Sequence, residues 1–334
     1  IRTRQACNMV YDNDKFRLLK KDKDKTKFLE AKEKEYSSLA EDDGLSIEKT
    51  NLKKYSPKFN KLLENLFKFV VDGKPVGKAL FYSEFRGDSG TEIFELILQS
   101  NGYTKYDPND TDKSKKLRYT FITGSESQDD RRLNKVAFND IENKYGEYIQ
   151  IMIISGAGAE GISLTCVRQV HILEPYWNYV RIDQVFGRAI RLGSHKDLEP
   201  SERNVEEYIY LCSLPEGNTI IDVYKSIKNL RTWKNVPNID DNDKNIVNIL
   251  YTNHKDIYDM IQKVIKLKSD TKNNTADQLL FNTMERKFVI SQEIIKVIQE
   301  SSVDCIQNTR DNIVLNDNCI RFDDKLLNED AFFP

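Results

Sequence analysis

The chain has 334 residues, of which 39% are hydrophobic and 31% are charged, enough for two domains or for one domain with large appendages. Its 51 Lys and Arg residues are balanced by 53 Asp and Glu residues, so the formal net charge is −2. This balance excludes a global basic field, and any surface for a polyanion must therefore be local.

The first 55 residues are dense in charge and lack a sustained apolar period. Such a composition is typical of a solvated linker that is at most partly helical, and we predict this for residues 1–55. A basic arm that contacts phosphates is the functional alternative, because basic residues outnumber acidic ones over residues 15–34.

Helices and strands alternate from Ser56 onwards. The first predicted helix covers residues 56–73, with Ser56 as its cap, Pro57 in its first turn and Gly73 near its end. Apolar runs predict strands at residues 78–85, 118–124, 148–155, 167–175 and 206–215. Helical patterns fill residues 91–103, 128–140, 178–193 and 219–230, and residues 105–116 are predicted as a loop. The alternation predicts an α/β domain over residues 56–232, with a mostly parallel sheet and helices on both faces.

The alternation stops after residue 232. Helical patterns at residues 256–268 and 277–302 predict a helical C-terminal extension over residues 233–334. The five cysteines lack C-x-x-C spacing, which argues against a zinc site and a disulfide framework and indicates a reducing, intracellular location. We see neither a run of membrane-spanning length nor a signal peptide, and the start at Ile1 rather than Met suggests a piece of a longer polypeptide.

A glycine-rich segment follows the third predicted strand. Gly156-Ala-Gly158-Ala-Glu160-Gly161 fits the G-x-G-x-x-G spacing of dinucleotide-binding folds, with Glu174 in the position of the ribose ligand. However, only thirteen residues separate Ser155 from Gln169, and those after the glycines are rich in β-branched types. A crossover helix does not fit in this length, which argues against the dinucleotide interpretation. A tight turn made possible by glycine is the plain alternative.

A second motif, QVFGRAIRLGSH, lies further along the chain. On a helix running from Ile182 to Leu192, one side is apolar and includes both of these residues. The other side carries one amide and two guanidinium groups beside a glycine, at Gln184, Gly187, Arg188 and Arg191. Two arginines one turn apart form a fork that suits a polyphosphate, although a solvated basic face is the structural alternative.

These segments, in this order and spacing, resemble superfamily 2 helicases and translocases. QVFGRAIRLGSH resembles their motif VI and IISGAGAEGISL their motif V, while KALFYSEF with the following helix resembles motif IV. The resemblance covers residues 56–230. Further segments, such as ILEPYWNYVRIDQVFGRAIRLGSH and RQACNMVYD, resemble the nucleoside triphosphatase I and early-transcription-factor helicases of poxviruses and giant viruses.

The resemblance implies a RecA-like second domain that works with a first RecA-like domain, the N-terminal half of the same polypeptide, on ATP, Mg²⁺ and a DNA or RNA strand. It assigns Arg188 and Arg191 as arginine fingers and Gln184 as a group that positions the γ-phosphate or the attacking water. Gly161 and Glu160 would lie near the nucleotide. The strand ends would contact nucleic acid through Ser83, Arg86, Thr123, Gly124, Ser155 and Gly156. RNA polymerase or transcription factors are further expected partners, and a virion or a cytoplasmic viral factory is the expected location.

The chain lacks the motifs of the first domain. The segment nearest to a phosphate-binding P-loop, Gly73 to Ala79, is one residue short and ends in Ala where a Mg²⁺ ligand is needed. We therefore expect these 334 residues alone to be inactive and the ATP to be held mainly by the missing domain. A non-catalytic module that docks on nucleic acid or polymerase is the alternative, and a Rossmann-type oxidoreductase or methyltransferase is the third hypothesis.

Overall fold

The computed structural model describes residues 2–9, 52–53 and 55–300, except residues 88, 110–115, 125, 157–160, 215–218, 229–235, 241–244 and 270–274. The basic run over residues 15–34, for which a phosphate-contacting arm is the functional alternative, and the tail after residue 300 lie outside this part of the chain. Among the described residues, none of the helices combines the length and the hydropathy of a membrane span.

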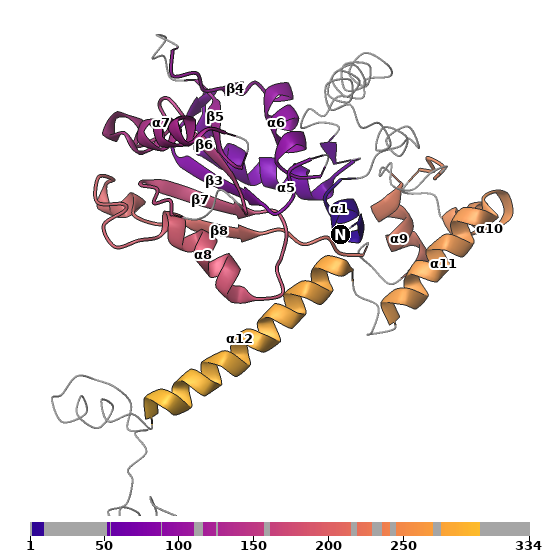
Figure 1. Cartoon of the computed structure of the whole chain (residues 1–334). Helices are drawn as coiled ribbons and strands as arrows, with labels where there is room; N and C mark the ends of the chain where they lie inside the picture. The colour runs from indigo at the N-terminus through magenta and orange to yellow at the C-terminus, as the bar shows by residue number, and fades with distance from the viewer. Residues whose placement is uncertain are drawn as a thin grey trace, which may run out of the picture.

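Six parallel strands form the central sheet, in the order β4-β5-β6-β3-β7-β8 (Figure 1). Their bounds are β3 Lys78–Ser83, β4 Thr104–Lys105, β5 Arg118–Ile122, β6 Ile151–Ser155, β7 Val167–Ile172 and β8 Glu206–Ile209. Every residue of β3, β5, β6 and β7 is buried, as expected for parallel strands covered on both faces. A short antiparallel hairpin, β1 Val70–Val71 with β2 Lys74–Pro75, precedes the sheet.

Side chains alternate between the two faces of each strand, so both faces of the sheet carry apolar residues and helices cover both. Ala79 and Phe81 of β3 face the cluster under α5 (Pro57–Leu66) and α6 (Thr91–Ser100). Leu80 and Tyr82 face the opposite cluster, under α7 (Gln128–Asn139) and α8 (Tyr179–Ala189). The predicted fold class, a mostly parallel α/β sheet with helices on both faces and a helical C-terminal region, is confirmed.

The connection between β6 and β7 crosses the sheet in a short length of chain. Both strands pair with β3, one on each side, so the chain must return across β3 from the carboxyl edge to the amino edge. Only eleven residues lie between Ser155 and Val167. The described residues of this connection, Gly156 and 161–166, contain no helix, and Ile162 and Leu164 are buried in the cluster with α8. We call residues 156–166 the crossover loop.

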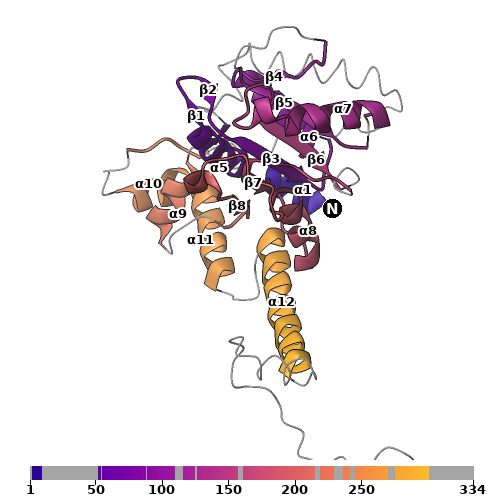
Figure 2. The same ribbon diagram turned by 90° about the vertical axis from the view of Figure 1, so that its left-hand side faces the viewer.

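The C-terminal helices form two groups. Helices α9 (Ile220–Ile227), α10 (Ile246–Asn253) and α11 (Lys255–Ser269) share a third hydrophobic cluster beside the sheet (Figures 1 and 2). The long helix α12 (Ala276–Glu300) begins against the sheet domain and projects away from it in both views. Helix α9 thus packs with α10 and α11 of the C-terminal extension. The domain boundaries predicted at residues 55 and 232 stay predictions.

Two local predictions differ from the structure. The side chain of Ser56 caps α5 by accepting from the Phe59 N–H and Pro57 opens the helix, as predicted. The helix ends at Leu66 rather than near residue 73, because residues 70–75 pair as a hairpin whose turn holds Gly73 at φ +70°. The N-terminal segment is also less solvated than predicted, since α1 (Arg2–Asn8) places Asn8 and Met9 in the interior.

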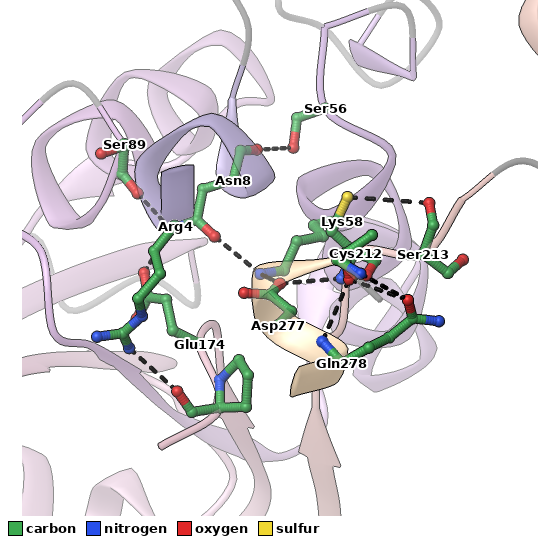
Figure 3. Close-up of polar contacts among 12 residues, drawn as sticks. Arg4, Asn8, Ser56, Lys58, Ser89, Glu174, Cys212, Ser213, Asp277 and Gln278 are labelled. Atoms are coloured by element: carbon green, nitrogen blue, oxygen red, sulfur yellow. Dashed lines mark hydrogen bonds and ion pairs between the residues drawn. The ribbon is translucent and has the colours of Figure 1, made fainter. Parts of the chain in front are cut away.

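A buried polar cluster joins distant parts of the chain (Figure 3). The Lys58 ammonium group donates to a carboxylate oxygen of Asp277 at 2.7 Å and to the side-chain oxygen of Asn8 at 2.8 Å. The Cys212 N–H donates to the same Asp277 oxygen at 2.9 Å. The Asn8 amide group donates in turn to the Ser89 carbonyl at 2.7 Å and to the Glu174 carboxylate. The cluster therefore ties α1, α5, the segment after β8 and the first turn of α12 together.

The Lys58–Asp277 ion pair gives a stability prediction. Its two side chains are only 3% and 0% exposed, so Asp277→Ala leaves a buried ammonium group without its counter-ion. We expect the free energy of unfolding to fall by about 3–5 kcal/mol, measured by urea denaturation followed by circular dichroism. The matched control is Glu64→Ala, which removes the exposed Lys61–Glu64 pair of the same helix and should cost about 1 kcal/mol or less. Equal losses in both variants would contradict the prediction.

Candidate functional site

The residues predicted to contact nucleic acid lie at one edge of the sheet. Parallel strands end at the same edge, and β5, β6 and β3 are neighbours there. Their ends or the following turns carry all six residues: Ser83, Arg86, Thr123, Gly124, Ser155 and Gly156. Three of them are buried (Ser83, Thr123 and Ser155), and Arg86 and Gly124 are exposed. Ser155 is 2% exposed, and its buried hydroxyl has no hydrogen-bond partner among the described residues.

Glu174 lies buried at this edge, just beyond β7. Its carboxylate accepts hydrogen bonds from the Ser83 hydroxyl at 2.8 Å, from the Glu84 N–H at 2.9 Å and from the Asn8 side chain. Burial raises the pKa of this carboxyl to about 7, against the opposing effects of the Lys58 charge and the three donors. Glu174 is therefore bound into the protein's own hydrogen bonds and is not presented to a ribose.

The crossover loop does not build a dinucleotide site. The predicted shortage of chain for a crossover helix is confirmed for its described residues. Gly161 has φ +73°, a conformation that favours glycine, and it lies at the turn where the loop begins its return across the sheet. Glu160, the second residue predicted near the nucleotide, lies outside the described residues.

The end of α8 holds two arginines against the crossover loop. A terminal nitrogen of Arg188 donates to the Ile162 carbonyl at 3.5 Å, while the Leu164 N–H donates to the Arg188 carbonyl at 2.9 Å. The Nε of Arg188 is buried without a hydrogen-bond partner among the described residues. Arg191 donates from Nε to the Gly187 carbonyl at 2.9 Å and from a terminal nitrogen to the Ser163 hydroxyl. Both guanidinium groups thus meet at residues 162–163.

The predicted helix is too long at this point. Helix α8 ends at Ala189, so Arg191 and Leu192 lie beyond it. Leu192, predicted on the apolar side, is fully exposed, because the chain turns at Gly193, which has φ +78°. Arg191 reaches the loop from the turn after the helix rather than from the helix face. Gln184, one turn before Arg188, is exposed.

The segment that partly resembles a P-loop is structural. Gly73 occupies a hairpin turn, and Lys78 is buried in the first position of β3. Its ammonium group donates to the Phe138 carbonyl at 2.7 Å and lies 4.5 Å from the centre of that ring. Burial lowers the pKa of Lys78 to about 8. In the described part of the chain, no group of His, Cys, Asp or Glu side chains is placed to hold a metal ion.

Sequence reasoning missed Arg181, which lies at the same edge as the strand ends. Its guanidinium forms an ion pair with Glu84 at 2.8 Å and donates to the Tyr82 hydroxyl at 3.2 Å. Its spacing of seven residues from Arg188 is the available signal, since positions i and i+7 share a helix face. Nothing in the local sequence indicates the partners Asn8, Lys58 and Asp277.

Comparisons with known proteins point to one family. Residues 58–193 match the family model of the helicase conserved C-terminal domain. A putative ATP-dependent RNA helicase of Acanthamoeba polyphaga mimivirus is 34% identical over 222 residues, covering 66% of this chain and 34% of the relative. A termination factor NPH-I homologue of African swine fever virus is 43% identical over 150 residues, covering 42% and 19%. A putative helicase of Invertebrate iridescent virus 3 is 35% identical over 161 residues, covering 48% and 16%. The chain thus spans about a third or less of these relatives' length.

The raised pKa of Glu174 gives a pH prediction. Between the ordinary value of 4.5 and about 7, the folded state keeps a proton that the unfolded state has lost. The free energy of unfolding therefore falls as pH rises through this window, by at most about 1.4 kcal/mol per pH unit, and levels off above it. We expect Glu174→Gln to remove this component of the slope in urea denaturation at several pH values. The exposed control Glu199→Gln should keep this component of the slope. Parallel pH profiles for wild type and Glu174→Gln would disprove the prediction.

Proposed function

We propose, from the match of residues 58–193 to the helicase conserved C-terminal domain family, that the chain is the second RecA-like half of an ATP-dependent viral helicase or translocase. The whole protein would use ATP hydrolysis to move along DNA or RNA. Its relatives include viral helicases and a protein named as a termination factor homologue, and we extend a role in transcription to this chain on that basis. RNA polymerase or transcription factors are the expected partners, and a virion or viral factory is the expected location.

One observation carries the proposal. Arg188 and Arg191 both contact residues 162–163, directly after the glycine-rich part of the crossover loop. Arg188 also keeps a buried Nε without a hydrogen-bond partner among the described residues, although such groups are normally paired. The Arg188 guanidinium group therefore keeps hydrogen-bonding capacity for an acceptor that arrives with another molecule. A phosphate oxygen is the acceptor that two neighbouring arginines fit best.

We assign Arg188 and Arg191 as arginine fingers on this ground. ATP with Mg²⁺, held mainly by the first RecA-like domain, would supply the phosphoryl group. The two guanidinium groups would stabilise the negative charge on its oxygens during transfer, and Gln184 would orient the γ-phosphate or the attacking water. Gly161 and Glu160 would border the nucleotide from the crossover loop.

The carboxyl edge of the sheet is the proposed nucleic-acid track. Backbone N–H groups and hydroxyls there can contact phosphates without reading bases. Ser155 supports this assignment through its buried hydroxyl, which lacks a partner among the described residues. Ser83, Thr123, Gly124 and Gly156 supply the neighbouring turns, and the exposed side chain of Arg86 supplies charge.

A second candidate function rests on α12. Its outer half exposes large apolar side chains, among them Val289, Ile290, Ile294 and Ile298, each more than half exposed. This favours a non-catalytic docking module that presents the helix to a partner protein. The two functions differ in one feature of the complete polypeptide. A P-loop and an acid pair upstream would establish the motor, and their absence would leave the docking module.

The first test concerns the chain alone. We expect these 334 residues to hydrolyse no ATP above background, because arginine fingers act only on a nucleotide that a P-loop holds. The measurement is phosphate release with and without single-stranded nucleic acid. Turnover that disappears in Arg188→Ala would contradict this expectation and assign a complete active site to the chain.

The second test concerns the complete polypeptide, in which both halves are present. We expect Arg188→Ala to reduce nucleic-acid-stimulated ATP hydrolysis by about 10³–10⁵-fold, the effect known for arginine fingers in GTPases, while nucleotide binding largely survives. Arg132→Ala, which removes an exposed arginine of α7, is the matched control and should keep full activity. Unchanged turnover in Arg188→Ala would refute the assigned role.

A further inference from the structure

Arg181 occupies the junction of three strand ends. It lies in the first turn of α8, and its partners Tyr82 and Glu84 lie at the carboxyl end of β3. Nη2 forms an ion pair with Glu84 at 2.8 Å, Nε donates to the Tyr82 hydroxyl at 3.2 Å, and Nη1 donates to the Tyr176 hydroxyl at 3.4 Å. The guanidinium also lies 4.7 Å from the centre of the Tyr176 ring. Tyr176 follows β7, so the group bridges β3 and β7.

The same guanidinium lies against the start of the crossover loop. A Cβ atom placed on Gly156 would lie 2.7 Å from Nη2 of Arg181 and 3.6 Å from the Glu84 carboxylate. The backbone after β6 and the Arg181–Glu84 pair are therefore in direct contact. Ser155, which has a buried hydroxyl, is the last residue of β6 and directly precedes Gly156. The glycine backbone after β6 and the Arg181 guanidinium group thus meet at one point.

The Arg181–Glu84 pair is weak enough to exchange. Its side chains are 36% and 27% exposed, and ion pairs open to water contribute little to stability. Three of the five N–H groups of the Arg181 guanidinium have the partners given above. The described contacts leave the other two N–H groups for a further acceptor. The Tyr82 hydroxyl donates to the Glu84 carboxylate at 2.8 Å, so Glu84 keeps a partner when the guanidinium turns away. Phosphate oxygens accept from arginine in the same forked geometry as a carboxylate.

We propose that Arg181 is a phosphodiester ligand of the nucleic-acid track, which exchanges its ion pair with Glu84 for a backbone phosphate beside Ser155 and Gly156. The inference rests on the proposed function, since it deepens the track assigned to the carboxyl edge. Glu84 restrains binding in this scheme, because its carboxylate competes with the phosphate for the same guanidinium.

The position of Arg181 also relates the track to the arginine fingers. Arg181 and Arg188 are seven residues apart on α8, which places them on one face and roughly 10 Å apart along the helix axis. Arg181 contacts the start of the crossover loop, and Arg188 contacts its return at Ile162. One rigid helix therefore carries a phosphodiester ligand at its first turn and a candidate arginine finger at its last.

The test measures binding of the full chain to fluorescein-labelled oligothymidylate and oligouridylate single strands over a series of salt concentrations. We expect Arg181→Ala to lower the slope of log affinity against log salt by about 0.7, the value of one phosphate contact on a single strand. Arg181→Lys should keep the slope because it keeps the charge. Glu84→Gln should bind roughly two- to fivefold more tightly, since the competing ion pair is gone.

The matched control is Glu64→Gln, which also removes a negative charge and frees a cation, Lys61, but on α5 on the opposite face of the sheet. We expect it to leave the affinity unchanged. The gain from Glu84→Gln should disappear when Arg181→Ala is also present, because the gain acts through that guanidinium.

Three results would overturn the proposal. A wild-type slope in Arg181→Ala, or a gain from Glu84→Gln that persists without Arg181, refutes the ligand role while the track itself survives. Wild-type chain that binds neither strand at low salt refutes the track and this inference with it. Binding to both strands with the expected coupling supports a contact to the shared phosphodiester backbone, and binding to one strand alone with that coupling supports the contact on that strand.

Discussion

The order of three strands constrains the rest of the structure. Because β3 lies between β6 and β7, the chain must cross the sheet in eleven residues to begin β7 parallel to the others. A helical crossover needs about a dozen residues or more, and the described residues of this connection, Gly156 and 161–166, contain no helix. It packs through Ile162 and Leu164 between the sheet and α8. The candidate site depends on this loop, because the loop contacts Arg181 at Gly156 and contacts Arg188 and Arg191 at residues 162–163.

A second constraint comes from the charge of the chain. With 31% charged residues, the protein must either expose its charges or pair them inside. In the interior, Lys58 pairs with Asp277, and Asn8 and the Cys212 N–H bond to the same two groups. The four residues come from four separate segments of the chain. Such a network fixes the position of α12 against α5. A shift of α12 would leave the buried Lys58 ammonium group without Asp277, whereas an apolar contact would tolerate the shift. The first turn of α12 is thereby held at a defined place, while its outer half projects with apolar side chains exposed.

Glu174 connects the two constraints. It lies at the carboxyl edge, receives hydrogen bonds from β3 and from α1, and belongs to the same polar cluster as Lys58. The N-terminal helix is therefore bonded to the strand end that carries Ser83. A displacement of α1 would disturb the geometry of the proposed nucleic-acid track through two hydrogen bonds. Residues 2–9 are in this respect part of the domain, although the composition of the N-terminal segment suggests a linker.

The sequence by itself determined the local elements. Apolar runs located the buried strands, Ser56 and Pro57 marked the start of α5, and the length after Gly161 ruled out a crossover helix. These features depend on neighbours within a few residues, where periodicity and capping operate. The same local reasoning extended α8 beyond Ala189, because the turn at Gly193 depends on contacts such as that of Cys166 N–H with the Ser194 carbonyl.

Only the tertiary structure decided which side chains meet. Lys58 and Asp277 are 219 positions apart, Asn8 and Glu174 are 166 apart, and Arg181 and Tyr82 are 99 apart. A charged residue read from sequence has many possible partners of opposite sign, and the strand order selects one of them. The arginine motif was therefore visible from its own spacing. The exchangeable pair of Arg181 and Glu84 was not, because it exists only where β3, β6 and β7 end side by side.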